Sequence, residues 1–350
     1  SGELLAVLAG QADGGFQSLT YHRAVNAPGL LVFELSADAQ AAGLLEHRGI
    51  VEVWRRDADA GIDWHRDYTG LILRRRWQYQ HTNRVTVYAP GILWLLGTRH
   101  VLYPAATSNR SMFLSSRAET IAKTLVEHNA GSAATLAGGR LREGAIAGLG
   151  VEPDQGRGNR LDWYCAYANV LETLQGLAAV GGGDFDLVQV GDGAAYEFRW
   201  HEGQLGADRS AKVVFGLDYG NMGRPVLDDN RIDERNVVAA LGQGEGADRE
   251  VVLRTAGDAD VEGTTDARNE ATTAALEALA DRRLVEWRGV QAFNFEALQT
   301  PASLYGLHYH LGDLVTARYG DISLVRKVVG VTIELRADGR ETVTPEFGAP

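Results

Sequence analysis

The chain has 350 residues, of which 45% are hydrophobic and 23% are charged, and its formal net charge is −12 at pH 7. This composition is typical of a globular protein and excludes a disordered chain or a fibrous repeat. Because single domains usually hold about 100 to 150 residues, the length predicts two or more domains.

Charge and cysteine content exclude further classes. Nucleic-acid binding depends largely on Lys and Arg, so the acidic balance predicts no sequence-specific nucleic-acid binding. A single cysteine, Cys165, excludes an internal disulfide framework and a Cys-based zinc site. The longest apolar runs, such as residues 91–97, are far shorter than the roughly 20 residues that cross a bilayer, which predicts no membrane span. The N-terminus lacks the features of a secretory signal, so we expect a cytoplasmic product.

The first hundred residues predict short strands with one buried face. Apolar and polar side chains alternate in residues 30–35, 50–55 and 84–89, and Val85, Val87 and Ala89 share one face. Groups of turn-forming residues separate these runs. The pattern predicts an N-terminal β-barrel-like domain over residues 1–102.

The period changes from 2 to 3.6 residues near Ser115. Apolar positions follow helical spacing from Ala118 to Val126, and Ser116 with Glu119 predicts a capping box at the helix start. A second helical stripe ends at the glycines of residues 181–183; its members are Tyr167, Val170, Leu171, Leu174, Leu177 and Ala178.

A hairpin should follow the second helix. Phe185 and Leu187 lead into a turn at residues 191–193, after which Tyr196, Phe198 and Trp200 alternate with polar side chains. Residues 103–200 are therefore predicted to form an inserted α+β domain.

The remaining chain returns to strands. We expect them at residues 213–215, 236–241, 250–254, 314–317, 322–336 and 341–344, with a helical insertion around residues 264–288. This pattern predicts a second β-barrel-like domain over residues 201–350. The predicted fold class is β-rich α+β, with two β-barrel-like domains and inserted α+β segments.

Candidate sites for chemistry are few. His308 and His310 could offer two imidazoles to a metal, but only Asp313 lies close in sequence as a third ligand, so surface histidines are the preferred interpretation. The glycines of residues 242–246 lack the spacing of a phosphate-binding loop and predict a hairpin turn. Cys165 lies among aromatic residues and is interpreted as part of the core.

Acidic pairs could in principle hold calcium or act in glycoside hydrolysis, although no calcium-loop pattern surrounds them. The pairs are Asp184/Asp186, Asp228/Asp229 and Asp258/Asp260. Arg74, Arg75 and Arg76 beside Trp77 indicate an exposed strand or a contact surface for acidic neighbours.

Several segments, taken in order, resemble the tail hub proteins of siphophages, a family related in fold to the baseplate hub of contractile-tailed phages. The opening reads SLTYHRAVNAPGLLVFEL, HRGIVEVWRRD and DYTGLILRRRW, and the first predicted helix begins SSRAETIAKTLVEHN. The later run VVFGLDYGNMGRPVLDDNRIDERNVVAALGQGEGADREVV holds Asn221, Asn236, Gly242, Gly244 and Arg249 at recurring positions. The last segment, from GLHYHLGD to TPEFG, resembles the closing barrel.

This resemblance implies a structural protein of the virion, made in the bacterial host cytoplasm and located at the tail tip. It implies a homotrimer whose paired barrels give a pseudo-sixfold ring. Its partners would be the distal tail protein ring, the tape-measure protein, and tail fibre or central spike proteins. The resemblance gives no catalytic, cofactor-binding or metal-binding residues, and the added C-terminal domains that carry a lysin in some hub proteins are not matched.

Two other functions are kept as alternatives. An acidic pair could serve a tail-associated cell-wall hydrolase, and Trp54, Trp64, Trp77 and Trp94 could serve a β-rich carbohydrate-binding module. If three copies surround a channel through which DNA leaves, an acidic lining would repel phosphate. The hub interpretation therefore predicts that acidic side chains line the channel.

Overall fold

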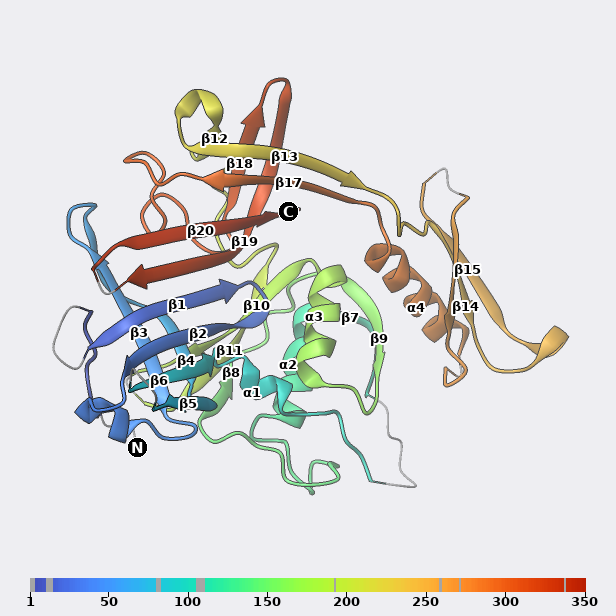
Figure 1. The fold of residues 1–350 in the computed structure, drawn as a ribbon. Coiled ribbons are helices and arrows are strands. Elements are labelled where there is room, and N and C mark those ends of the chain that lie inside the picture. Colours follow the sequence, from blue (N-terminus) through green and yellow to red (C-terminus); the bar gives the residue numbers. More distant parts are fainter. Residues whose placement is uncertain are drawn as a thin grey trace.

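A computed structural model of the chain describes residues 4–10, 15–79, 83–104, 111–191, 193–257, 260–270, 272–336 and 338–350. Strands outnumber helices throughout, which confirms the predicted β-rich α+β class (Figure 1). None of the helices in these ranges has the length and apolar character that a membrane crossing requires.

The largest element is an eight-stranded sheet in the order β12-β18-β19-β1-β2-β6-β5, with β20 also paired to β19. Neighbouring strands are antiparallel except for β12 and β18, which are parallel. The strands are β1 (Phe16–Ala24), β2 (Ala27–Ser36), β5 (Arg74–Gln78), β6 (Arg84–Pro90), β12 (Val214–Gly216), β18 (Leu314–Tyr319), β19 (Ile322–Arg336) and β20 (Glu341–Gly348).

The two ends of the chain share this sheet. β1 pairs with β19 from Ser18 opposite Arg336 to Ala24 opposite Gly330. We expected residues 1–102 and 201–350 to form two barrel-like domains, each with its own sheet. The structure instead joins strands of both ranges in one sheet. Alternation along a strand predicts its buried face, but it says nothing of the strand that will pair with its edge. The division at residues 102/103 and 200/201 stays a prediction.

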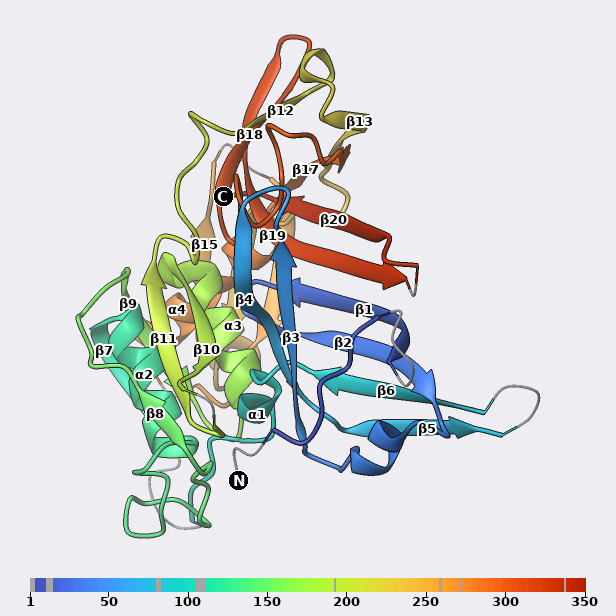
Figure 2. The same cartoon turned by 90° about the vertical axis from the view of Figure 1, so that its left-hand side faces the viewer.

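One face of the sheet forms the main core. Val85, Val87 and Ala89 are fully buried, as their alternation predicted. Farther along the sheet Phe215 lies at the centre of an aromatic cluster, with its ring centroid 5.3 to 5.4 Å from three other rings; these belong to Phe295, Tyr309 and Phe347. The hairpin of β3 (Ile50–Asp57) and β4 (Ile62–Leu71) runs across the strands of the main sheet (Figure 2).

The middle of the chain has its own hydrophobic core. It comprises α1 (Trp94–Gly97), β7 (Ser111–Arg117), α2 (Ala118–Asn129), β8 (Leu149–Val151), β9 (Arg160–Cys165), α3 (Val170–Gly181), β10 (Gly183–Gln189) and β11 (Tyr196–Glu202). The predicted hairpin is confirmed by the pairing of β10 with β11, although Asp192 of its turn lies outside the described residues.

The helix ends differ in how they are stabilised. At the start of α3 the Asn169 side chain accepts hydrogen bonds from two backbone N–H groups, and at its end Gly182 has a φ of 66°. The predicted capping box at α2 is wrong. Arg117 is the N-cap without a side-chain bond, because Ser116 still belongs to β7 and Glu119 is turned into the protein.

A two-stranded ribbon of β13 (Met222–Asn230) and β17 (Val290–Ala297) carries a small unit away from the main sheet (Figure 1). This unit holds β14 (Val237–Leu241), β15 (Val251–Thr255), β16 (Glu262–Asp266) and α4 (Thr273–Glu286). The helix begins later than predicted because residues 262–266 pair with β14 as a strand. Residues 242–246 lie in the connection between β14 and β15, which confirms the predicted hairpin turn.

Candidate functional site

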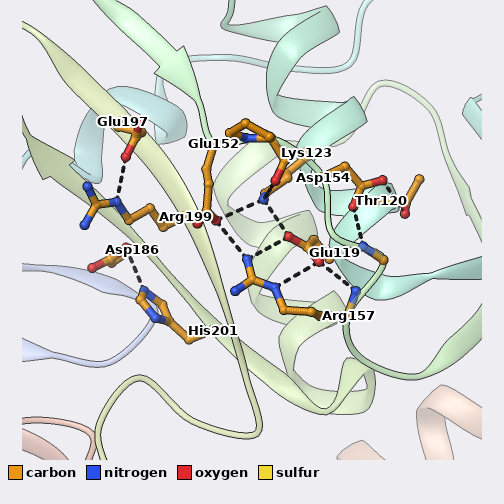
Figure 3. A network of polar contacts seen from close by, with 12 residues as sticks. Glu119, Thr120, Lys123, Glu152, Asp154, Arg157, Asp186, Glu197, Arg199 and His201 are labelled. Carbon is orange, nitrogen blue, oxygen red and sulfur yellow. Dashed lines mark hydrogen bonds and ion pairs between the residues drawn. The ribbon is translucent and has the colours of Figure 1, made fainter.

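The most developed polar cluster joins α2 to the segment that follows β8. Glu119 is fully buried, and Lys123, one turn later on the helix, is 4% exposed. Glu152 and Arg157 approach from the other segment, and the four side chains point toward one another (Figure 3). The sequence interpretation missed this cluster because it assigned Glu119 to a helix cap.

The contacts of the cluster are short and satisfy every charge. Lys123 Nζ lies 2.5 Å from Glu119 Oε1 and 3.0 Å from Glu152 Oε2. Arg157 donates from Nη2 to the same two carboxylates at 2.7 and 2.8 Å, and its backbone N–H donates to Glu119 Oε2 at 2.6 Å. Two cations thus face two carboxylates.

Burial acts to raise the pKa of the Glu119 carboxyl, but hydrogen bonds from Arg157 and Lys123 outweigh it and hold the pKa at about 2. The pKa of Glu152 is lowered in the same way, since bonds from Lys123 and Arg157 oppose the effect of burial. A general acid or base needs a pKa near the working pH. The cluster therefore has the character of a brace between two segments.

A second buried cluster lies where the first and last parts of the chain meet. Asp67 of β4 accepts hydrogen bonds from Tyr21 Oη at 2.5 Å and from Arg23, which also donates to Tyr305 Oη at 3.1 Å. Burial and the adjacent Asp67 raise the pKa of Tyr21 well above its usual range, and burial raises the pKa of Tyr305 to about 12. Both phenols are protonated at neutral pH, so the cluster is a set of structural hydrogen bonds.

The histidines considered as metal ligands have separate partners. His308 Nδ1 accepts from the Leu304 N–H at 3.0 Å, whereas His310 Nε2 lies 3.1 Å from the Gly306 carbonyl oxygen. Asp313 is buried and bonded to Arg209 Nε at 2.7 Å. Among the residues that the structure describes, no group of three His, Cys, Asp or Glu side chains could hold a metal ion.

The acidic pairs are tied to the fold or exposed where the structure describes them. Asp184 bonds to Lys327 Nζ at 2.5 Å and to Asn26 Nδ2 at 2.9 Å, and Asp186 lies 3.0 Å from His201 Nε2. Asp228 and Asp229 lie on the exposed ribbon strand β13. Asp258 lies outside the described residues, and Asp260 is exposed.

The remaining predicted positions are dispersed. Cys165 is half-buried in β9 and packs against the core of the middle part, in keeping with the structural interpretation. Trp54 and Trp64 are exposed, whereas Trp77 and Trp94 are half-buried. Arg74 and Arg76 are exposed on the edge strand β5, as the sequence predicted; Arg75 instead donates to the Leu45 carbonyl.

A cavity of about 260 Å³ lies between the first and middle parts of the chain. Its polar lining includes Arg23, Asp67 and Asp186, all three already paired with other side chains. Gln189 also lines the cavity, and its Oε1 atom is buried without a hydrogen-bond partner. A site for small polar molecules such as water suits this lining better than a catalytic site.

The sequence model of the family described as Siphovirus ReqiPepy6 Gp37-like protein matches residues 7–349 of the chain. No curated protein sequence matches the chain.

Solved structures of tail proteins share the fold. A tail protein from Neisseria meningitidis MC58 aligns with a TM-score of 0.54 and 16% identity, over 95% of this chain and 92% of that one. The 43 kDa tail protein of prophage MuSo2 from Shewanella oneidensis aligns with a TM-score of 0.52 and 13% identity, over 96% and 94%. Prophage tail protein gp18 from Listeria monocytogenes EGD-e aligns with a TM-score of 0.50 and 10% identity, over 95% of this chain and 88% of that one. At these identities the likeness concerns the fold.

Proposed function

Because the chain belongs to the Siphovirus ReqiPepy6 Gp37-like protein family, we propose that it is the structural hub of a phage tail tip or baseplate. The observation that carries this proposal is the family match over residues 7–349, which also confirms the resemblance to siphophage tail proteins. The shared fold with tail proteins of two prophages and of a Neisseria strain supports the same role.

In the proposed assembly the chain forms a homotrimeric ring. The ring joins the distal tail protein ring and the tape-measure protein to tail fibre or central spike proteins, and it is located in the virion at the tail tip. A head-to-tail contact between unlike surfaces closes into a ring when the rotation between copies allows it. Among the described residues β5, β12 and β20 each pair with one strand of the main sheet, so unlike sheet edges are available for such a contact.

DNA passage through the ring stays part of the proposal, and an acidic lining of the channel stays a prediction. Strand register places five basic and three acidic side chains on the face of the sheet that points away from the core; they are Arg74, Arg76, Arg84, Arg318, Arg336, Glu34, Glu334 and Glu346. Lys327 lies on the same face, but its charge is paired with Asp184. If this face borders the channel, the lining is basic on balance. With such a basic lining, repulsion between carboxylates and phosphate could not be the reason that DNA passes without sticking.

We assign no enzymatic role. A cell-wall hydrolase remains the main alternative, but its acidic candidates Asp184 and Asp186 are bonded to Lys327 and His201. A retaining or inverting pair must instead flank a substrate cleft with one carboxyl free to protonate the leaving group. Turnover of host cell wall by the purified chain, abolished by Asp184→Asn or Asp186→Asn, would favour the hydrolase.

A carbohydrate-binding module is supported only by Trp54 and Trp64, whose side chains are exposed on the β3–β4 hairpin. Each of these rings already has an arginine over it, Arg66 at 6.0 Å for Trp54 and Arg56 at 5.1 Å for Trp64. The arginine side chains thus partly cover the ring faces on which a sugar would stack.

The experiment that tests the hub is removal of the gene from the particle that encodes it. We expect tails without a tip structure in electron micrographs and no infectious particles, with recovery when the intact chain is supplied from a plasmid. Normal tails that lack the chain would contradict the proposal.

A further inference from the structure

Four arginines gather where three segments of the chain meet. Arg48 lies just before β3, Arg99 follows α1, and Arg140 and Arg142 lie in the connection between α2 and β8. None of the four forms an ion pair with an acidic residue that the structure describes. A group of unpaired cations in a chain of net charge −12 is a candidate site for an anion.

Crossed hydrogen bonds hold two of these segments together. Arg99 Nε donates to the Gly144 carbonyl oxygen at 2.5 Å. In the opposite direction, Arg140 Nη2 donates to the His100 carbonyl oxygen at 2.7 Å. The backbone at Gly144 packs so closely on Arg140 that a Cβ atom there would lie 1.5 Å from Nη1. The guanidinium groups of Arg99 and Arg140 are therefore held in place before any ligand arrives, which lowers the entropy cost of binding.

The charges of the cluster act against one another. Burial, followed by the charges of Arg142 and Arg48, lowers the pKa of Arg99. Burial and the charges of Arg99 and Arg142 lower the pKa of Arg140, and Glu143 only partly offsets them. Arg140 is 4% exposed, and its Nε atom is buried without a hydrogen-bond partner. Backbone carbonyls bond to these side chains but carry no net charge, so the positive charge is left for an anion to neutralise.

Three of the four arginines keep donors that a ligand can reach. Arg48 and Arg142 are exposed, and Arg99 is half-buried. Within the described chain Arg99 donates from Nε and Nη1, which leaves Nη2, and Arg142 donates only from Nε. Arg140 is buried and contributes its charge instead of a direct contact.

The number of positive charges indicates the class of anion. A carboxylate brings one negative charge and two oxygens, whereas a phosphate group with a free second ionisation brings nearly two charges and three acceptor oxygens. The planar donors of a guanidinium match phosphate oxygens in pairs. We propose that Arg48, Arg99 and Arg142 bind a phosphate dianion, supported by the buried charge of Arg140. Inorganic phosphate and a phosphate monoester share this chemistry, whereas the diester of a DNA backbone carries a single charge per phosphate.

Isothermal titration calorimetry of the full chain, just above neutral pH and at constant ionic strength, tests the site. The probes are inorganic phosphate, phenyl phosphate and a single-stranded DNA oligonucleotide without a terminal phosphate. We expect saturable binding of the first two to the wild type. Arg48→Gln/Arg142→Gln should weaken it about tenfold or more, because charge-assisted hydrogen bonds are lost. The matched control is Arg224→Gln/Arg340→Gln, which removes the same charge from side chains 90% and 80% exposed elsewhere.

The outcomes decide between a site and a general effect of charge. Binding that is lost in Arg48→Gln/Arg142→Gln and kept in the control supports the site, and the phenyl phosphate result tells whether a monoester is accepted as well as the free ion. No saturable heat with inorganic phosphate, or equal weakening in both pairs of variants, overturns the site. Tighter binding of the oligonucleotide than of either dianion overturns the assignment to a dianion. Unchanged far-ultraviolet circular dichroism verifies that each variant is folded.

Discussion

Among single residues, Glu119 has the sequence spacing of a helix cap but the structural environment of a buried ion pair. Three residues after Ser116 it has the spacing of a capping box, yet the structure gives it two cationic partners and no exposed surface. The local pattern contained Glu119 and its partner Lys123 but not its second partner, Arg157, which comes 38 residues later in the chain. A contact between distant segments leaves no trace in local spacing.

Replacement of Glu119 by glutamine should destabilise the protein strongly. A glutamine removes one of the two negative charges and leaves Glu152 as the single carboxylate that pairs with Arg157 and with Lys123, which is 4% exposed. Breaking a buried pair in this way costs about 3 to 5 kcal/mol. Urea denaturation at neutral pH measures the difference. The control is Glu172→Gln on the exposed side of α3, which should change the free energy of unfolding by less than about 0.5 kcal/mol.

Acid should remove the same stabilisation. The ordinary pKa of 4.5 for Glu119 falls to about 2 in the folded chain, so the contribution is complete above pH 4.5 and is lost as the pH falls from there toward 2. The difference corresponds to about 3 kcal/mol. Denaturation of the wild type and Glu119→Gln as a function of pH should give curves that converge toward acid. A constant separation would contradict this assignment.

Among the elements, alternation predicted many of the strands, and helical spacing predicted α2 and α3 but not the short α1. Val85, Val87 and Ala89 are buried as expected, and α3 ends at the predicted glycines. The ribbon strands β13 and β17 were missed. In β13 most side chains are exposed, so the polar run of residues 228–230 has no buried face to reveal. The pairing of β1 with β19 was also missed, because edge partners are chosen by the fold as a whole.

Asn221 was placed by resemblance at a recurring position, and the structure gives it a physical role at the edge of β12. Asn221→Ala would leave the Val214 carbonyl and the Gly216 N–H unpaired, with a cost of about 1 to 3 kcal/mol. It would also open a strand edge to other chains. We expect a lower midpoint of thermal unfolding together with larger, polydisperse particles in light scattering. A stable variant of unchanged mass would argue against the role.

The unit of β14, β15, β16 and α4 should unfold separately from the main sheet. Its small core centres on Leu276, which is fully buried against β14 and β15. Leu276→Ala should weaken this core by about 2 to 5 kcal/mol. Hydrogen exchange would then rise in residues 237–286 and stay unchanged in β1, β2 and β6. Leu253→Ala, at a leucine 58% exposed in the same unit, should leave exchange unchanged.

Across the whole molecule, the two signs of charge are placed in a way that the net charge does not indicate. The chain carries −12, yet the outward face of its main sheet bears more arginine and lysine than glutamate. The acidic surplus therefore lies on other surfaces, such as the ribbon and its small unit. Net charge could not predict where each sign is placed, because register decides which face a residue occupies.

In the proposed assembly, copies of this chain form a closed ring of three. Native mass spectrometry of the purified full chain measures the number of copies in the assembly. One chain has a mass of 37.8 kDa, so we expect a species of three times that mass, about 113 kDa, without a series of larger assemblies. A protein that remains at 37.8 kDa under all conditions in which it is folded, or that forms assemblies of unlimited length, would contradict the closed ring.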